Sequence, residues 1–346
     1  MKKNLLITAF SLFSILIFAQ EKQGKAKVAI VGFYNIENLY DTENDPTKDD
    51  EEFLPDGKNK WTQDRYLAKL ERMSDVISKL GGEIVKSGPT VLGLCEVENK
   101  KVVEELVGQP ALKKWDYGVV HYDCRYNRGV DVAFCYQKAR FKVSNSKSYP
   151  LYSPEDTSFT TRDQLLVSGM LDGEEMHFIV NHWPSRRGGE KRSAPMRELA
   201  AKLCRSIVDS IYKINENAKI IIMGDLNDDP TDASVYKHLG AIGNKDKVEK
   251  NGLFNAMYKL FKDGIGSLAY KDSWNLFDQI IVSGNLLGDD KSTYKFLKAR
   301  VFNEKFLMQK EGNFAGYPFR TYVGDVYQGG FSDHFPVYVF LTKEIK

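Results

Sequence analysis

AKIIIMGDLNDD, residues 218–229, is the stretch that decides the fold. The run 220–223 has no polar face, which predicts a strand buried on both sides. Gly224 lets the backbone turn and be approached closely. Asp225 and Asn227 are two residues apart, so they can project to the same side where the strand ends. A carboxylate and an amide at the edge of a sheet do not serve packing, but they suit a metal ion or a phosphate.

Further apolar runs, rich in Val, Ile, Phe and Tyr, predict strands along the whole chain. These runs are residues 28–34, 91–95, 117–122, 130–136, 164–171, 176–180, 277–282 and 335–341. Amphipathic patterns predict helices over 63–80 and 194–214, with Pro195 in the first turn of the second. Because some strands follow each other directly, we expect an α/β fold with two mixed β-sheets flanked by helices, rather than one open parallel sheet.

The N-terminus has the pattern of a secretory signal peptide. Lys2 and Lys3 precede an apolar run that ends near Ala19 and Gln20. A membrane anchor is the alternative, but the run is short for a membrane span. We therefore expect a signal peptide at 1–19, export to the periplasm or the medium, and no stable membrane insertion after cleavage.

The remaining residues, 20–346, contain no internal repeat and no Pro-rich or Ser-rich linker, so we expect one catalytic domain. Two segments look like insertions. Residues 41–60 are acidic and predict a solvated loop. Residues 286–327 are long, weakly periodic and aromatic, which indicates an excursion on the substrate side.

Charge and cysteine content limit the function further. The chain has 49 basic and 47 acidic residues, and loss of Lys2 and Lys3 with the signal peptide leaves it neutral. A grip on nucleic acid through global charge is therefore not indicated, and any attraction for phosphate must be local. Cys95 and Cys204 lie in apolar patterns. Export would permit a disulfide between Cys124 and Cys135, although spacing alone does not establish its geometry.

Polar residues recur where the predicted strands end. Each alone is usually a turn, a cap or a satisfied polar group, but together they indicate a site. The residues are Asn35, Glu96, Asn181, His182, Asp225, Asn227, Asp333 and His334, with Asp278 inside an apolar run.

This constellation resembles the endonuclease/exonuclease/phosphatase superfamily, which includes exonuclease III and pancreatic deoxyribonuclease. The match runs in the family's order from Asn35 to His334. Its most specific pieces are GDLN at 224–227 and SDH at 332–334, and VLGLCEV at 91–97 resembles the strand with the family's metal-binding glutamate. The resemblance implies a four-layered α/β sandwich and metal-dependent cleavage of phosphate esters.

The metal site is expected around Glu96, with Asn35 and Asp333 as neighbours. Mg²⁺ prefers few carboxylates together with water and substrate oxygens, so Mg²⁺ is the expected ion, and Mn²⁺ and Ca²⁺ are the other candidates. One residue departs from the family pattern. Glu37 stands where a small or neutral residue is more usual, which suggests an altered metal site.

The catalytic roles follow from the same resemblance and from acid–base chemistry. His334 is expected to be the general base, oriented by Asp278. Asp225 and Asn227 are expected to face the phosphate, and His182 to protonate the departing oxygen. An acid amid apolar neighbours needs a partner, which favours the pairing of Asp278 with His334.

Candidate phosphate contacts come from arginines. Arg162 resembles a phosphate-binding arginine of the family, and a surface ion pair is its alternative role. After His182, the loop carries Arg186, Arg187, Lys191 and Arg192, which suits contacts to a phosphate backbone unless it is simply solvated. Asp131 begins a strand on the same side, where it could orient His182 or take a second metal.

The leading hypothesis is an exported Mg²⁺-dependent phosphodiesterase, most simply a nuclease with nucleic acid as its substrate. The alternative is a phosphatase or phospholipase-like hydrolase of inositol phosphates or phospholipid head groups. A third hypothesis, a polyanion-binding module without catalysis, does not explain the base and its orienting acid. The sequence indicates no protein partner.

Overall fold

The computed structural model describes residues 26–345. The predicted signal peptide lies outside this range. Within residues 26–345, no helix is both long and apolar enough to cross a membrane.

The first sheet has six strands in the order β14-β17-β1-β2-β4-β3. β1 and β2 run parallel and the other neighbours antiparallel, so this sheet is mixed. The strands are β1 (Ala26–Leu39), β2 (Val91–Val97), β3 (Tyr117–His121), β4 (Asp131–Gln137), β14 (Lys295–Val301) and β17 (Val337–Glu344).

The second sheet has seven strands in the order β5-β6-β7-β8-β13-β10-β9. The pairs β7–β8 and β9–β10 are parallel and the rest antiparallel. The strands are β5 (Phe141–Tyr149), β6 (Gln164–Leu171), β7 (Glu174–His182), β8 (Ile220–Asp225), β9 (Ala241–Ile242), β10 (Leu253–Asn255) and β13 (Asp278–Ser283).

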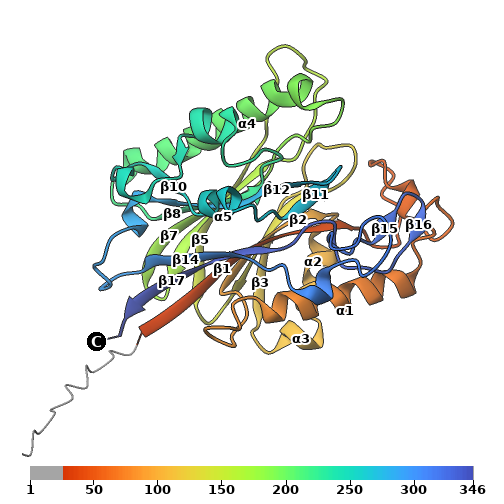
Figure 1. The fold of residues 1–346 in the computed structure, drawn as a ribbon, viewed down its shortest axis with the longest axis horizontal. Coiled ribbons are helices and arrows are strands. Elements are labelled where there is room, and N and C mark those ends of the chain that lie inside the picture. The colour runs from red at the N-terminus through yellow and green to blue at the C-terminus, as the bar shows by residue number, and fades with distance from the viewer. Residues whose placement is uncertain (1–25, 346) are drawn as a thin grey trace, which may run out of the picture.

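Helices cover the outer faces of the two sheets (Figure 1). α1 (Gln63–Lys79), α2 (Lys100–Val107) and α3 (Pro110–Lys113) lie on the first sheet, and α4 (Glu190–Ile214) covers the second. This arrangement confirms the predicted α/β fold with two mixed sheets flanked by helices.

Short elements complete the chain. They are α5 (Tyr258–Lys262), the hairpins β11 (Leu268–Tyr270) with β12 (Ser273–Asn275) and β15 (Tyr322–Val323) with β16 (Val326–Tyr327), the 3₁₀ helices Glu51–Phe53, Lys245–Lys247, Gly284–Leu286 and Lys305–Leu307, and the π-helix Ser234–Leu239.

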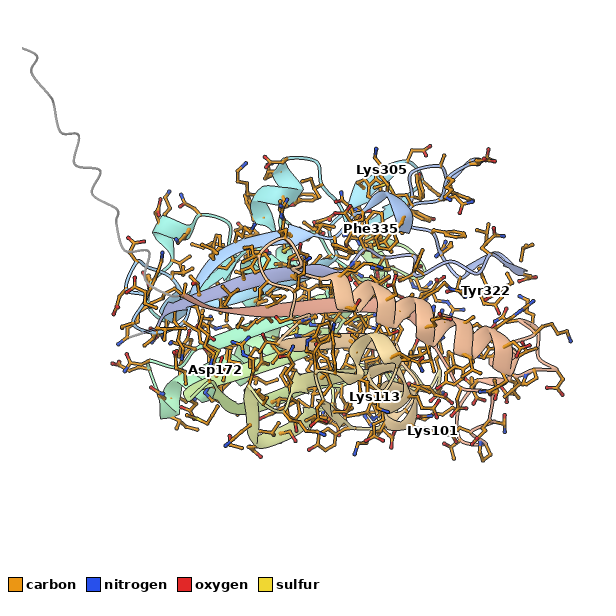
Figure 2. The ribbon with its side chains drawn as sticks, turned by 90° about the horizontal axis from the view of Figure 1, so that it is seen from below. Lys101, Lys113, Asp172, Lys305, Tyr322 and Phe335 are labelled. Carbon is orange, nitrogen blue, oxygen red and sulfur yellow. The ribbon has the colours of Figure 1, made fainter. Side chains whose placement is uncertain are left out.

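Apolar side chains fill the space between the sheets (Figure 2). β2 and β8 approach each other closely at Gly93, where a Cβ atom would lie 2.6 Å from Met223 Sδ. A second apolar cluster lies between the second sheet and α4. Both faces of β8 are thus buried, as its uninterrupted apolar sequence predicts.

Several expectations differ from the structure. β5 and β14 were not predicted, because each is an edge strand with much of its length exposed and no apolar run. α4 begins at Glu190, so Pro195 lies inside the helix rather than in its first turn. The segment 41–60 is not simply solvated, since Asp41, Asp50 and Phe53 are buried. The segment 286–327 contributes β14 to the first sheet.

The cysteines form no disulfide. Cys95, Cys124, Cys135 and Cys204 are all free and buried. The bridge between Cys124 and Cys135 that export would permit is therefore absent.

Gly224 joins the fold to the site, because it pairs with Asn181 of β7 directly before Asp225. A Cβ atom on Gly224 would lie 2.4 Å from the backbone oxygen of Asn181. We expect Gly224→Ala to destabilise the protein by about 1–3 kcal/mol, because backbone cannot move aside as a flexible side chain can. Urea unfolding measures this, with the exposed Ser273→Ala as control. Equal midpoints for the two variants would contradict the close approach.

Candidate active site

Strand register brings three of the predicted residues side by side in the second sheet. Asp225, at the end of β8, is paired with His182 of β7 on one side and with Asp278 of β13 on the other. The three side chains are buried. The apolar run of β8 ends at Asp225, and the register of β7, β8 and β13 therefore places two acids and an imidazole in one row.

The first sheet contributes the facing residues. Asn35 of β1 pairs with Cys95 of β2, directly before Glu96. The pairing is interrupted after Cys95, and Glu96 adopts a left-handed backbone conformation with φ of 61°. This bulge turns the Glu96 side chain toward Asn35.

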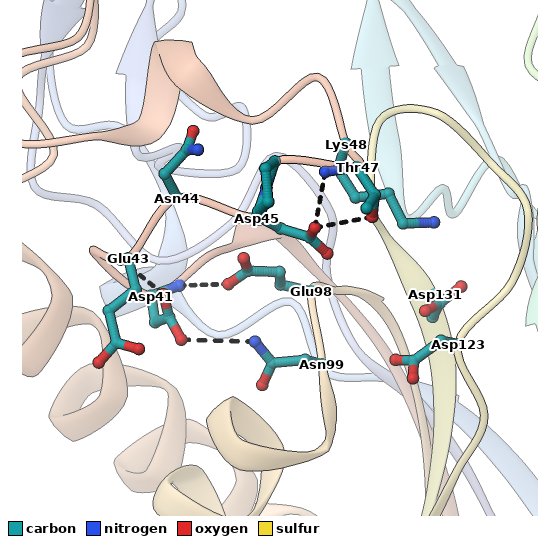
Figure 3. A pocket seen from close by; sticks show the side chains of 12 residues that line it. Asp41, Glu43, Asn44, Asp45, Thr47, Lys48, Glu98, Asn99, Asp123 and Asp131 are labelled. Carbon is teal, nitrogen blue, oxygen red and sulfur yellow. Dashed lines mark hydrogen bonds between the residues drawn. The ribbon is translucent and has the colours of Figure 1, made fainter.

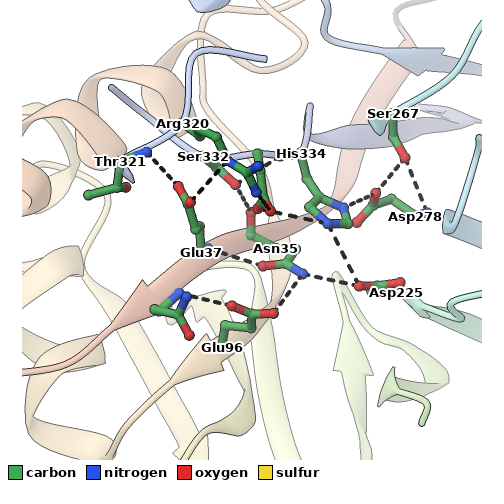
Figure 4. Close-up of polar contacts among 12 residues, drawn as sticks. Asn35, Glu37, Glu96, Asp225, Ser267, Asp278, Arg320, Thr321, Ser332 and His334 are labelled. Atoms are coloured by element: carbon green, nitrogen blue, oxygen red, sulfur yellow. Dashed lines mark hydrogen bonds and ion pairs between the residues drawn. The ribbon is translucent and has the colours of Figure 1, made fainter. Parts of the chain in front are cut away.

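His334 and Asp278 form a buried hydrogen-bonded pair (Figure 4). His334 Nδ1 lies 2.6 Å from Asp278 Oδ2, and Ser267 Oγ donates to the same carboxylate oxygen. Burial alone would lower the pKa of His334, but the carboxylates of Asp278, Asp333 and Asp225 outweigh it and raise the pKa well above its ordinary value. Asp278 thus fixes both the orientation of the ring and its affinity for a proton.

The other nitrogen of His334 faces the centre of the site. His334 Nε2 lies 4.0 Å from Asp225 Oδ2 and 3.9 Å from Asp333 Oδ1. Asp333 also forms an ion pair with Arg320. A water or a phosphate oxygen beside Nε2 would therefore lie between two acids and within reach of an arginine.

Asn35 lies between two carboxylates. Its Nδ2 donates to Glu96 Oε1 at 3.3 Å and to Asp225 Oδ2 at 3.1 Å. Burial raises the pKa of Asp225 to about 6; His334 opposes this shift and Asp278 adds to it. The buried acids repel one another, and a cation among them would relieve that repulsion.

The donor set fits a hard divalent cation. Glu96 and Asp225 supply carboxylate oxygens around the single Asn35 side chain, and such oxygen ligands suit Mg²⁺. Asp225, Asp278 and His334 also present ligand atoms within 4.8 Å of one another. Asp333 lies on the His334 side of the site and is held by Arg320.

His182 lies beside these acids in a different protonation state from His334. Its Nε2 is 3.6 Å from Asp225 Oδ2 and 3.9 Å from Glu96 Oε1. Burial, and then the positive charges of Arg162, His334 and Arg128, lower the pKa of His182 well below its ordinary value. The ring is therefore neutral at pH 7 and can donate a hydrogen bond without carrying charge.

Asn227 lies at the turn after β8, with a positive φ of 51°. Its backbone N–H donates to Asp225 Oδ1 at 2.9 Å, and its side chain donates to the Trp183 carbonyl oxygen at 3.0 Å. Arg162 donates to the same carbonyl oxygen at 2.6 Å and is buried. Arg162 therefore lies at the site but braces the Trp183 backbone.

Arg186 is not a free phosphate ligand, contrary to the sequence prediction. Its Nε donates to the Asn227 carbonyl oxygen, and Nη2 contacts Asp228 at 3.0 Å and Asp232 at 2.7 Å. Its Nη1 pairs with Glu190 at 2.9 Å. All three guanidinium nitrogens are engaged within the protein, so Arg186 holds the turn that positions Asn227. Arg187 is exposed in the same loop, and Arg192 is exposed in the first turn of α4 rather than in the loop that the sequence predicted.

Asp131 does not orient His182. Its Oδ2 lies 3.4 Å from His121 Nε2, and its Oδ1 accepts from the Cys124 backbone N–H at 3.2 Å. The register explains this, because Asp131 pairs with Val97 and lies next to β3 rather than β7.

Four contributors to the site were missed from sequence. Ser267 contacts Asp278, and Ser332 donates to the Asn35 carbonyl oxygen at 2.6 Å while accepting from the His334 N–H. Buried Lys69 donates to Thr321 Oγ1 at 2.6 Å, beside Arg320. Only Ser332, next to Asp333, had a sequence signal.

Glu37 points away from the metal-binding oxygens. Its Oε2 accepts from the Thr321 N–H at 2.7 Å, and its Oε1 lies 3.6 Å from Arg320 Nε (Figure 4). Burial, and then the charge of Asp333, raise the pKa of Glu37 to about 7. The unusual residue therefore anchors the segment that carries Arg320.

Residues 30–343 match the model of the endonuclease/exonuclease/phosphatase family. The chain belongs to this family. It is accordingly a metal-dependent phosphoester hydrolase, as the sequence predicted. No curated protein is similar enough in sequence to match the chain.

Solved structures share the fold at low sequence identity. A family member from Bacteroides thetaiotaomicron has a TM-score of 0.54 and 16% identity, covering 93% of this chain and 97% of its own. TDP2 from D. rerio, in a complex with a single-strand DNA product, has a TM-score of 0.53 and 16% identity, covering 91% of this chain and 98% of its own. A mannosyl-6-phosphatase from Bacteroides thetaiotaomicron has a TM-score of 0.53 and 16% identity, covering 90% of this chain and 99% of its own.

The ion pairs of Arg186 make a prediction that separates it from its neighbours. Arg186→Ala leaves the buried Asp228 with fewer partners, so we expect a loss of about 1–3 kcal/mol in stability. Arg192→Ala, at an exposed position in the first turn of α4, is expected to leave the unfolding midpoint unchanged. Equal melting temperatures for the two variants would contradict these ion pairs and leave Arg186 as a free surface cation like Arg192.

Proposed function

We propose that the protein is an exported Mg²⁺-dependent phosphodiesterase that hydrolyses nucleic acid by in-line attack of water. The observation that carries the chemistry is the buried His334–Asp278 pair, whose free Nε2 faces Asp225 and Asp333. Export rests on the pattern of residues 1–19. An N-terminus at Met1 on the protein recovered from cells would contradict it.

Glu96, Asn35 and Asp225 are the residues that would hold the metal ion, with Asp333 nearby on the His334 side. When bound, the ion polarises the phosphoryl oxygen and offsets its developing charge. The chain itself supplies the position, because the hydrogen bonds of Asn35 hold both carboxylates in place.

His334 acts as the general base. Its Nδ1–H is held by Asp278, which leaves the Nε2 lone pair free to accept a proton from water. Asp225, 4.0 Å from Nε2, helps to position that water. Because neighbouring carboxylates raise the pKa of His334, activity increases as pH rises through that pKa.

His182 and Asn227 act on the substrate oxygens. Neutral His182 can donate a hydrogen bond to the departing oxygen, but it does not protonate that oxygen as the sequence predicted, because loss of its proton would leave an imidazolate. Asn227 has one amide hydrogen on the Trp183 carbonyl, and the other can bind a non-bridging oxygen. The turn that aims Asn227 is held by Arg186.

Nucleic acid as the substrate is supported by the exposed cations of the loop after His182. Arg187 is exposed in that loop, Lys191 and Arg192 are exposed in the first turn of α4 that follows it, and such a group suits contacts to a phosphate backbone. The second candidate is a phosphatase acting on a small phosphoester. It is favoured because Arg186 is engaged within the protein and does not belong to that exposed group. It is also favoured by the acidic pocket around Asp41 and Glu98, which would repel a long polyanion.

A substrate panel tests the proposal. The purified protein is given plasmid DNA, linear DNA, RNA, inositol phosphates, a sugar phosphate, sphingomyelin and a generic phosphodiester. Cleavage of nucleic acid is expected with Mg²⁺, and EDTA is expected to abolish it until Mg²⁺ or Mn²⁺ is restored. Release of phosphate from the small esters alone would favour the phosphatase, and undiminished turnover in EDTA would contradict the metal mechanism.

Asp278→Asn tests two effects of Asp278 on His334, namely the orientation of the ring and its pKa. Loss of the carboxylate lowers the pKa of His334, so the acid limb of the kcat/KM profile should move to lower pH. The maximal rate should fall by about 10²–10⁴-fold, because the ring loses its fixed orientation. The control is Asp272→Asn, at an exposed position before β12. Gln279, the next residue of β13, is buried like Asp278 and is therefore not used. An unchanged profile would remove Asp278 from the mechanism.

A further inference from the structure

An acidic pocket of about 520 Å³ lies beside the loop that joins β3 to β4 (Figure 3). Its lining includes the carboxylates Asp41, Glu43, Asp45, Glu98, Asp123 and Asp131. Lys48 also lines it, but its ammonium donates to the carbonyl oxygens of Cys124 and Tyr126. Lys101 pairs with Asp41 and Glu43, and burial raises the pKa of Glu98 to about 8, so the negative charge that attracts cations comes mainly from Asp45, Asp123 and Asp131.

His121, at the end of β3, has a buried nitrogen without a hydrogen bond, and it lies beside two of the acids that line this pocket. The side chain is only 2% exposed, and Nε2 has no hydrogen-bond partner. Nε2 lies 3.4 Å from Asp131 Oδ2, and Nδ1 lies 3.8 Å from Asp123 Oδ1. Buried polar atoms are rarely left unsatisfied in native proteins, so an unpaired imidazole nitrogen beside the Asp131 carboxylate points to an absent partner.

We propose that His121, Asp123 and Asp131 form a second metal site, which binds a divalent transition-metal ion of the Zn²⁺ type. Their ligand atoms lie within 4.8 Å of one another. With metal–ligand distances of about 2.1 Å, two atoms 3.4 Å apart subtend an angle of about 108° at the ion, close to tetrahedral. Asp123 is 79% exposed and can swing the remaining distance.

The donor set decides the class of ion. Ca²⁺ and Mg²⁺ prefer oxygen ligands alone, whereas imidazole together with carboxylate suits Zn²⁺ and other first-row transition metals. Three protein ligands leave a fourth position for water or for a further group. The site shares no residue with the Glu96 site or with the group of Asp225, Asp278 and His334.

An ion here would clamp the β3–β4 loop onto the start of β4. That loop carries Arg128, whose guanidinium donates to Asn38 Oδ1 at 2.7 Å. The Asn38 N–H in turn donates to Glu96 Oε2 at 3.0 Å. Two hydrogen bonds therefore connect the loop that the proposed ion would clamp to Glu96, although binding of the ion does not depend on the proposed substrate.

Calorimetric titration of the metal-stripped, purified protein with Zn²⁺ tests the proposal. His334→Gln is used as the background, because it removes the other histidine-containing group. The Glu96 site remains in this background, so one equivalent that depends on His121 is expected in addition to any Zn²⁺ bound there. Adding His121→Gln should lower the affinity by more than about tenfold, the effect of losing even a residue that only supports a ligand. Asp123→Asn should act in the same direction, and its exposed position keeps the fold intact.

His238→Gln provides the matched control. His238 also lies near a carboxylate, 3.2 Å from Glu198, but has no second acid beside it. It should leave Zn²⁺ binding unchanged. Three results would overturn the site: no binding in the His334→Gln background, equal affinity with and without His121, or binding that Ca²⁺ reproduces and the His121 substitution does not affect.

Discussion

The structure depends on one electrostatic constraint, the burial of carboxylates against one another where the two sheets meet. Asp225 and Asp278 are almost completely buried, and Glu96 lies within reach of the same Asn35 amide. Buried charges of one sign are costly unless they are hydrogen-bonded and balanced. The His334 ring, the Asn35 amide and a bound cation together provide that balance. In the proposed mechanism the same groups bind a phosphate and activate a water, so stability and chemistry would have one origin.

The outer loops are held by ion pairs that leave the central residues free for substrate. Arg186 holds the turn after β8 through Asp228 and Asp232, and this fixes Asn227. On the opposite side, Arg320 lies between Glu37 and Asp333. Arginines that sequence alone suggests as phosphate ligands can thus act as internal braces. The chain has a net charge of only +2, so in the proposed mechanism attraction of a phosphate substrate depends on exposed cations near the site, such as Arg187.

Sequence predicted the parts of the fold and site that have a strong local signal. β6 occupies residues 164–171, the range of its apolar run, and the strand-end residues converge because apolar β7, β8 and β13 lie in register. The edge strands β5 and β14 were not predicted, because exposed, polar strands lack the apolar periodicity that marks a strand. The partners of Arg186, the contact of Ser267 with Asp278 and the pairing of Asp131 with His121 depend on tertiary register. Local patterns carry no information about such contacts.

The protonation of His334 tests the account most directly. NMR titration of the imidazole signals, assigned with His334→Gln, gives the pKa of this ring within the folded protein. The carboxylates around it predict a value well above about 6.5, with His182 remaining neutral over the same range. A His334 ring that titrates at or below about 6.5 would contradict the proposed hydrogen bond to Asp278 and the general-base mechanism built on it.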